Sequence, residues 1–294
     1  GAFAPALSPD GAWLAYVVGS QPLPPPFSLR VLGPDGDSLV TSTLSAPEFF
    51  GFPMEWDSLN VAWGPESGLL YFVESGADGI QRLMQANIRG RGEPAISLHE
   101  GAAGERILDI AVSPDESRIA YVALPQREVA ESGVYLWERY SGEVRTLEEA
   151  TTGQSYLAGW VDNGSLVFVH GEPISSGGRT SNAFVLGVEG DERRDLEIVD
   201  QAITQTAILD PAGKRLLMTA VNQGVHNIFE IDLDGQTTPR PLTANVSASV
   251  SFSGLGVASN GDLMYVRQEV NSNVWLIELA ISSRYSNRKG QEPQ

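Results

Sequence analysis

A turn motif that returns at a nearly constant spacing constrains this chain more than any other feature. In its fullest copy, Ser8-Pro9-Asp10-Gly11 is followed by an apolar run from Trp13 to Val17. Proline and aspartate preset a tight turn, and glycine supplies the positive φ that the turn requires. The positions equivalent to the proline are 9, 65, 114, 162, 211 and 259, so the spacings are 56, 49, 48, 49 and 48 residues.

Each repeat unit continues in the same order after the apolar run. A variable segment leads to a third strand such as Val134-Tyr135-Leu136-Trp137, and a turn and a more polar fourth strand follow. Four antiparallel strands in each of six units predict an all-β fold, a six-bladed β-propeller. In the last unit, residues 281–285 are the candidate fourth strand. We therefore expect a single propeller domain over residues 1–294, with blades at about 4–44, 59–99, 108–148, 156–199, 205–244 and 253–285.

The turn motif and the Ala15-Tyr16-Val17 strand after it resemble the WD40-like Pro-Asp repeat of TolB-like β-propellers. The resemblance runs over residues 4–285. Members of that family include periplasmic interaction modules, sensor halves of membrane-anchored regulators, propellers that gate serine peptidases, and metal-dependent lyases of acidic sugars. The resemblance implies a periplasmic or extracellular location. Full-length TolB carries a separate α/β domain ahead of its propeller, whereas the first repeat starts at once here.

The C-terminal residues extend the same comparison. Residues 291–294, Gln-Glu-Pro-Gln, look like the segment that precedes another Ser-Pro-Asp-Gly turn in this family. We therefore expect that the sequence is an excerpt from a longer chain. The remainder would be a DNA-binding output domain, a membrane anchor or further repeats.

Charge and composition exclude several classes of function. The formal net charge is −18, with 37 acidic and 19 basic residues, so the chain would repel a phosphate backbone, and we expect no contact with nucleic acid. The absence of cysteine excludes disulfides, thiolate metal sites and cysteine nucleophiles. No apolar run approaches the roughly 20 residues of a transmembrane helix, so we expect no membrane insertion by this domain.

The first connection between units is the longest, and its composition is unusual. It accounts for the first spacing of 56 residues and is rich in aromatic side chains. One interpretation is an apolar anchor for a partner or ligand at the mouth of the propeller. The other is a plug that folds over the mouth and buries itself. The candidate binding residues in this segment are Phe49, Phe50, Phe52, Met54 and Trp56.

Other connections at the same mouth are polar. Asparagine recurs just before the third strand, at Asn182, Asn227 and Asn273, where its side chain is predicted to cap local backbone. Loops on a rigid scaffold commonly carry function. Further candidate residues for binding a protein, a peptide or a small-molecule ligand are Arg127, Arg179, Asn222, His226 and Asn271.

The sequence assembles no recognisable catalytic site. The Gly-x-Ser-x-Gly elbow is absent, and the only histidines are His99, His170 and His226. His170, Glu172 and His226 are weak candidates for a metal site, without the spacing of a known zinc motif. We therefore predict a non-catalytic binding or sensor domain that needs no cofactor. The alternatives are a metal-assisted lyase or hydrolase of carbohydrate, a propeller that gates a peptidase domain outside this chain, and a structural spacer.

Overall fold

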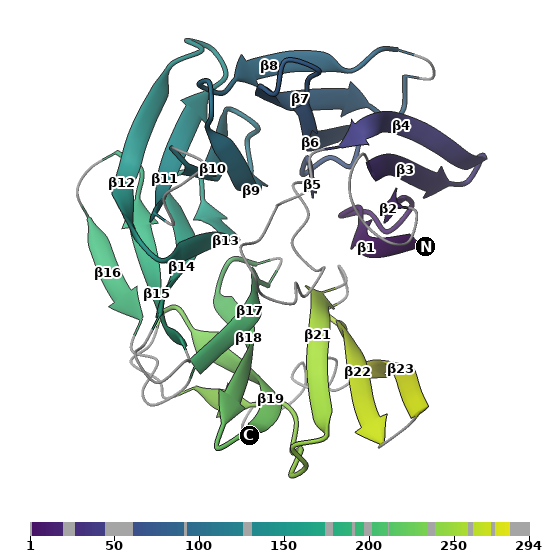
Figure 1. Ribbon diagram of the computed structural model, residues 1–294, viewed down its shortest axis with the longest axis vertical. Helices are drawn as coiled ribbons and strands as arrows, with labels where there is room; N and C mark the ends of the chain where they lie inside the picture. The colour runs from purple at the N-terminus through teal and green to yellow at the C-terminus, as the bar shows by residue number, and fades with distance from the viewer. Residues whose placement is uncertain are drawn as a thin grey trace, which may run out of the picture.

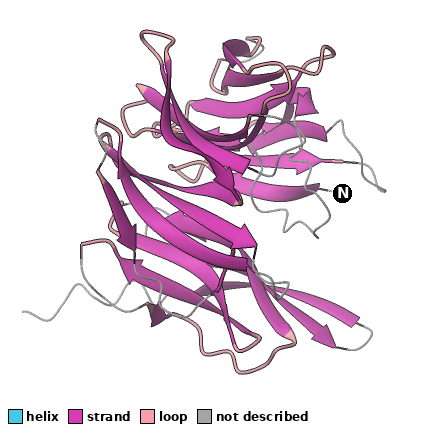
Figure 2. Cartoon of the chain, turned by 60° about the vertical axis from the view of Figure 1, so that its left-hand side comes forward, coloured by secondary structure: helices cyan, strands magenta, loops and turns pink. Residues whose placement is uncertain are grey.

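A computed structural model shows an all-β chain whose strands radiate from a common centre (Figure 1). The structure describes residues 2–19, 27–44, 61–90, 93–125, 131–173, 179–189, 192–196, 202–210, 212–234, 239–257, 261–271 and 274–282. No helix occurs in these ranges (Figure 2). The described residues therefore contain no helix that is long and apolar enough to span a membrane.

The strands follow one another in antiparallel hairpins, so neighbours in each sheet are mostly neighbours in the chain. The first eight strands are β1 (Ala2–Leu7), β2 (Leu14–Val18), β3 (Phe27–Gly33), β4 (Gly36–Leu44), β5 (Val61–Trp63), β6 (Leu69–Ser75), β7 (Gln81–Asn87) and β8 (Ile96–Glu100). The next eight are β9 (Arg106–Val112), β10 (Arg118–Leu124), β11 (Glu131–Glu138), β12 (Val144–Thr152), β13 (Gln154–Asp162), β14 (Ser165–Pro173), β15 (Arg179–Gly187) and β16 (Arg193–Leu196). The last seven are β17 (Ala202–Leu209), β18 (Arg215–Asn222), β19 (Val225–Asp232), β20 (Arg240–Pro241), β21 (Val250–Val257), β22 (Leu263–Asn271) and β23 (Val274–Ser282).

Hydrogen bonding divides these strands into sheets of eight, four, four, four and three. The eight-stranded sheet consists of β1–β4 and β5–β8, which are joined where Leu44 pairs with Glu74. We call β1–β4, β5–β8, β9–β12, β13–β16, β17–β20 and β21–β23 groups 1 to 6, and the packing between two consecutive groups a seam. The candidate fourth strand at 281–285 was wrong in part, because Ile281 and Ser282 belong to β23, the third strand of group 6.

The Pro-Asp motif forms the turn between the first and second strands of a group. The Ser8 hydroxyl donates to the Asp10 carboxylate at 2.6 Å and accepts the Trp13 N–H at 3.0 Å, while Asp10 accepts the Ala12 N–H. Asp10 and Ser8 therefore satisfy backbone donors that the turn would otherwise leave unpaired. The copy in group 3 repeats this network with Ser113, Asp115, Ser117 and Arg118.

The same turns also join consecutive groups. The Asp10 N–H donates to the hydroxyl of Ser67, which lies in the equivalent turn of group 2, at 3.0 Å. The Trp63 indole N–H donates to the Ala6 carbonyl on the first strand of group 1 at 2.9 Å. The seam between groups 3 and 4 has both bonds, from the Asp115 N–H to Asn163 and from the Trp160 indole to the Ala111 carbonyl.

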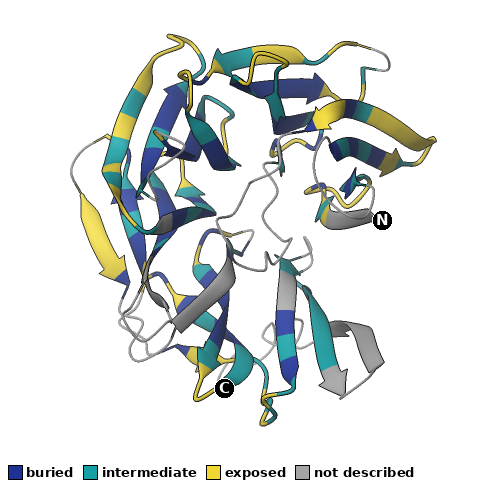
Figure 3. Ribbon diagram, viewed as in Figure 1, coloured by how far each residue is buried: buried dark blue, intermediate teal, exposed yellow. Residues whose placement is uncertain are grey.

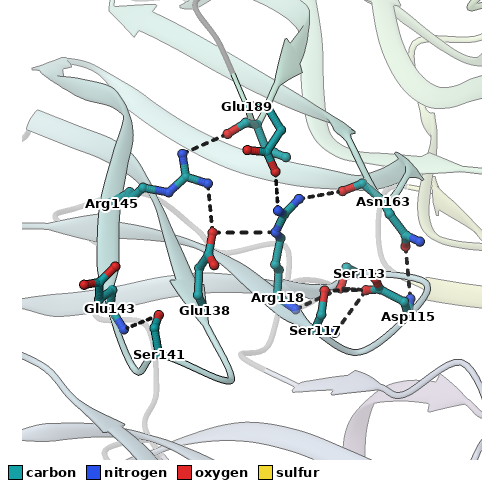
Figure 4. Close-up of polar contacts among 11 residues, drawn as sticks. Ser113, Asp115, Ser117, Arg118, Glu138, Ser141, Glu143, Arg145, Asn163 and Glu189 are labelled. Atoms are coloured by element: carbon teal, nitrogen blue, oxygen red, sulfur yellow. Dashed lines mark hydrogen bonds and ion pairs between the residues drawn. The ribbon is translucent and has the colours of Figure 1, made fainter.

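Ion pairs add to the seam between groups 3 and 4 (Figure 4). The Arg118 guanidinium donates to the Asn163 carbonyl at 3.0 Å and to the Glu189 carboxylate. It also lies 3.7 Å from Glu138, which accepts from Arg145 at 2.9 Å. These side chains are partly exposed, so their contribution to stability is modest.

Among the described residues, the hydrophobic core consists of five clusters, and each cluster lies between two consecutive groups. Strand β10 shows the principle, because successive side chains of a strand point to opposite faces. Ala120 and Val122 belong to the cluster shared with group 4, whereas Ile119 and Tyr121 belong to the cluster shared with group 2. The strand is therefore buried on both faces (Figure 3).

Two turn glycines test how tightly the turns fit against neighbouring groups. Gly11 and Gly213 both have positive φ, but only Gly213 abuts another group, since an added Cβ would lie 2.4 Å from the Val161 carbonyl. We predict that Gly213→Ala lowers the free energy of unfolding by much more than Gly11→Ala does. The latter should cost about 1–2 kcal/mol, the usual penalty of a left-handed alanine. Equal losses in urea denaturation would contradict this fit.

Candidate functional site

The chain order places the starts of the first and third strands and the ends of the second strands at one end of the sheets, opposite the Pro-Asp turns. We call this end the mouth. At the seam between groups 3 and 4, the Ser132 hydroxyl at the start of β11 accepts the Ser155 N–H at 2.7 Å and donates to the Gly153 carbonyl at 3.3 Å. Both serines are buried. They therefore join the third strand of one group to the first strand of the next.

His170 belongs to this seam. Its Nδ1 lies 2.9 Å from the Ser155 hydroxyl and its Nε2 lies 3.2 Å from the Thr152 carbonyl. A carbonyl can only accept, so the Nε2–H donates to Thr152, and in the corresponding tautomer Nδ1 accepts a hydrogen bond from the Ser155 hydroxyl. His170 is thus bonded both to the end of β12 in group 3, at Thr152, and to the start of β13 in group 4, at Ser155.

The same arrangement recurs with amide side chains at other seams. The side-chain Oε1 of Gln81, at the start of β7, accepts the Ile107 N–H of β9 at 2.5 Å. Asn227, at the start of β19, accepts the Asn245 N–H at 2.7 Å and the Thr243 hydroxyl at 2.8 Å. The prediction that Asn227 caps local backbone just before the third strand was wrong, because Asn227 is the third residue of β19 and its partners Thr243 and Asn245 lie 16 and 18 residues away.

Asp109 is a carboxyl group inside an apolar strand. One oxygen accepts the Leu157 N–H of β13 at 2.7 Å, and the other accepts the Ile110 N–H at 2.9 Å. Burial raises the pKa of Asp109 to about 7, although the two N–H donors act in the opposite direction. No repeat motif marks Asp109, and the available sequence signal is an acid within the apolar run Ile107–Ala111.

His226 occupies a different seam from His170. His226 lies two residues from Ile228 in β19 and therefore on the same face, and Ile228 belongs to the cluster shared with group 6. His170 lies two residues from Phe168 in β14 and on the same face, and Phe168 belongs to the cluster shared with group 3. Nδ1 of His226 is buried without a hydrogen-bond partner, and burial lowers the pKa of the ring. Within the described ranges, no three His, Asp or Glu side chains come together as metal ligands would.

The connection that was expected to carry Asn222 and His226 is only a two-residue turn. Asn222 is the exposed end of β18 and pairs with Val225, while Gln223 and Gly224 both have positive φ, as tight hairpins of this length require. Glu172, Arg179 and Asn271 are paired strand residues whose side chains lie outside the description. The remaining candidates, Phe49, Phe50, Phe52, Met54, Trp56 and Arg127, lie outside the described residues.

Comparison with solved structures identifies the architecture. TolB from Acinetobacter baumannii matches 93% of this chain with a TM-score of 0.64 and 14% identity. The fold is that of a TolB-like β-propeller. Oligogalacturonate lyase in complex with manganese matches 90% of the chain with a TM-score of 0.62 and 14% identity. The β-propeller domain of the Trilobed protease from Pyrococcus furiosus, described as having an open velcro topology, matches 95% with a TM-score of 0.56 and 10% identity.

At such low identity these similarities concern the fold alone. The chain spans 62% of the TolB chain, 70% of the lyase chain and 96% of the protease propeller. No family model and no curated protein matches the sequence.

The raised pKa of Asp109 makes stability depend on pH. Because the folded pKa of about 7 exceeds the ordinary value of 3.8, this group favours folding at pH 4 and loses that contribution as the pH rises through 7. We predict that the melting temperature of Asp109→Asn minus that of wild type is more positive at pH 8 than at pH 5.

The control is Asp115→Asn, because hydrogen bonds from Ser117 and other donors hold the pKa of Asp115 below its ordinary value. That variant should be less stable than wild type, and the deficit should be larger at pH 8 than at pH 4. An Asp109→Asn variant with the same pH profile as wild type in thermal unfolding would contradict the assignment.

Proposed function

We propose that groups 1 to 6 are the blades of a six-bladed propeller built on a plan of four strands per blade, forming one domain over residues 1–294. We propose further that this domain is a non-catalytic binding or sensor module in the periplasm or outside the cell. Its partner would be a protein, a peptide or a small molecule bound at the mouth.

The observation that carries this proposal is that polar side chains at the mouth form hydrogen bonds at the seam between two groups. The side chains of Ser132, His170 and Asp109 are bonded to the backbone at the seam between groups 3 and 4. The Ser155 hydroxyl is bonded to the His170 ring. Such bonds fix the positions of the strand ends and favour a rigid rim. The variable segments mounted on that rim are then free to determine binding.

The segment with Phe49, Phe50, Phe52, Met54 and Trp56 is the strongest candidate for contact with a partner. Aromatic side chains supply much of the binding energy at protein interfaces when they enter a pocket of the partner. The net charge of −18 favours a basic or neutral partner, because it would accelerate the approach of positive charge and repel an acidic surface.

A second candidate is a metal-assisted lyase or hydrolase of carbohydrate. The fold similarity to a lyase in complex with manganese and the unpartnered Nδ1 of His226 favour it. Such a site would draw on His226 without His170, because the two rings lie at different seams.

Thermal-shift measurements distinguish the two functions. We predict no stabilisation by manganese and a rise in melting temperature with a peptide or small-molecule ligand. A ligand at a hundred times its Kd stabilises the fold by about 2.7 kcal/mol. The double variant Phe50→Ala/Trp56→Ala should abolish that rise.

Tyr140→Ala is the matched control, because Tyr140 is an aromatic residue that is 90% exposed in the hairpin between β11 and β12, at the end opposite the mouth. It should leave the rise unchanged. A ligand response that survives the double variant would remove the site from the aromatic segment. A manganese response that is lost in His226→Ala would favour the metal-dependent alternative.

A further inference from the structure

A hollow with a volume of about 440 Å³ lies at the turn end of group 4, opposite the mouth. Its lining comes from the turn between β13 and β14, from β15 and from the residues around the start of β16, and it includes Asp162, Ser165, Val185, Gly187, Glu192 and Arg194. Sites for small molecules in proteins usually have volumes of about 300–1,000 Å³. The hollow is therefore large enough for a small ligand.

Four of the lining positions lie on the face of group 4 that points toward group 5. Val185 packs on the cluster shared with group 5, and Gly187 lies two residues further along the same strand. Arg194 pairs with Val185, and Ser165 pairs with Gly187. Positions that are paired across two strands, or two apart in one strand, share a face.

In group 3 the same positions hold an ion-pair network (Figure 4). Arg118 and Glu138 are the first residue of the second strand and the last residue of the third, and they pair with each other. Arg145, on the fourth strand, pairs with Leu136, two residues before Glu138. Arg145 donates to the Glu138 carboxylate at 2.9 Å, and the Arg118 guanidinium lies 3.7 Å from it. One carboxylate is thus shared by two guanidiniums.

Group 4 lacks this carboxylate and one of the two cations. Ser165 and Gly187 occupy the positions of Arg118 and Glu138, because they are again the first residue of a second strand and the last of a third. The arginine of the fourth strand remains as Arg194. Within the described ranges, its side chain has no hydrogen-bond or ion-pair partner. Two small residues thus leave both the hollow and an unpaired guanidinium.

Group 5 repeats the arginine–carboxylate pair of group 3. Arg240 pairs with Glu230 across the strands, as Arg194 pairs with Val185. The Nε of Arg240 donates to the Glu230 carboxylate at 2.7 Å. Of the three equivalent arginines in groups 3 to 5, Arg194 is therefore the one without an acidic partner from its own group. A guanidinium presents parallel N–H donors that match a carboxylate, so Arg194 is suited to bind one from a ligand.

The hollow also offers acceptors for a cationic group. One carboxylate oxygen of Asp162 accepts the Gly164 N–H at 2.8 Å and the Ser165 hydroxyl at 2.9 Å. The other oxygen of Asp162 and the carboxylate of Glu192 have no partner in the described part of the chain. A ligand with one carboxylate and one ammonium group would therefore replace both charges that group 4 lacks relative to group 3.

We propose that this hollow binds a zwitterionic α-amino acid, with its carboxylate on Arg194 and its ammonium group toward Asp162 and Glu192. Val185 would contact an apolar side chain of the ligand. The formal net charge of −18 repels a dianion, whereas a zwitterion carries no net charge and is not repelled. The site lies at the end opposite the mouth, so it goes beyond the binding proposed there and does not depend on it.

Calorimetric titration of the whole chain with the proteinogenic L-amino acids tests the site, with L-leucine as the first probe. We predict saturable binding of leucine that Arg194→Gln weakens about tenfold or more, because a charged hydrogen-bond pair is lost. Isocaproate, which is leucine without its amino group, and isoamylamine, which is leucine without its carboxylate, should also bind about tenfold more weakly or worse. Gly187→Glu should abolish binding, since its carboxylate would take the place beside Arg194 that Glu138 has beside Arg145.

Arg240→Gln is the matched control, because Arg240 is the equivalent arginine and is already paired with Glu230. It should leave leucine binding unchanged, as should Phe50→Ala/Trp56→Ala at the mouth, whereas Gly187→Glu should remove only the response at the hollow. Arg194→Gln should keep the wild-type melting temperature without ligand, which separates lost binding from unfolding. Absence of binding by every amino acid of the set would overturn the proposal. Wild-type affinity in Arg194→Gln, or equal affinities for leucine and isocaproate, would also overturn it.

Discussion

The second strands of groups 2 to 5 are buried on both faces, and the rest of the fold follows from this arrangement. In β14, Leu166 and Phe168 belong to the cluster shared with group 3, while Val167 and Val169 belong to the cluster shared with group 5. Burying one large apolar side chain stabilises a fold by about 1.5–3 kcal/mol. A group with a single neighbour could bury only one of these faces, so each of these groups depends on both of its neighbours.

Polar side chains complement this apolar packing at both ends of the seams. At the turn end, Asp10 and Trp63 use backbone and indole N–H groups to reach the neighbouring group. At the mouth, Gln81, Ser132 and Asp109 accept backbone N–H groups of the next first strand. A buried N–H without a partner costs free energy, so these acceptors fix how consecutive groups are placed. The segments between the fixed strand ends can then vary without loss of the scaffold.

Much of the fold could be predicted from the sequence because its determinants are local. The Pro-Asp turns repeat at regular spacing, and runs such as Leu69–Val73 are apolar throughout, as strands buried on both faces require. The bonds of Asn227 were not predictable in this way, since it lies within β19 and its partners Thr243 and Asn245 are 16 and 18 residues away. The short turn at Gln223 and Gly224 was missed because Asn222 and Val225 had been assigned to a loop and are instead paired strand residues.

The site was less predictable because its contacts join residues that are distant in sequence. Asp109 and Leu157 are separated by 48 residues, and nothing in the spacing of the acid marks its partner. His170 and His226 were expected to approach each other because they lie in adjacent repeat units. Because successive side chains of a strand point to opposite faces, His170 instead lies on the face toward group 3 and His226 on the face toward group 6.

The central claim is that neighbouring groups form an interlocked unit rather than independent sheets. Native-state hydrogen exchange in rising denaturant measures the free energy at which each strand opens. The account predicts that the amides of β10 and β14 open at one common free energy, because the cluster between them contains residues of both strands. Separate opening of β10 and β14, each at its own free energy, would contradict it.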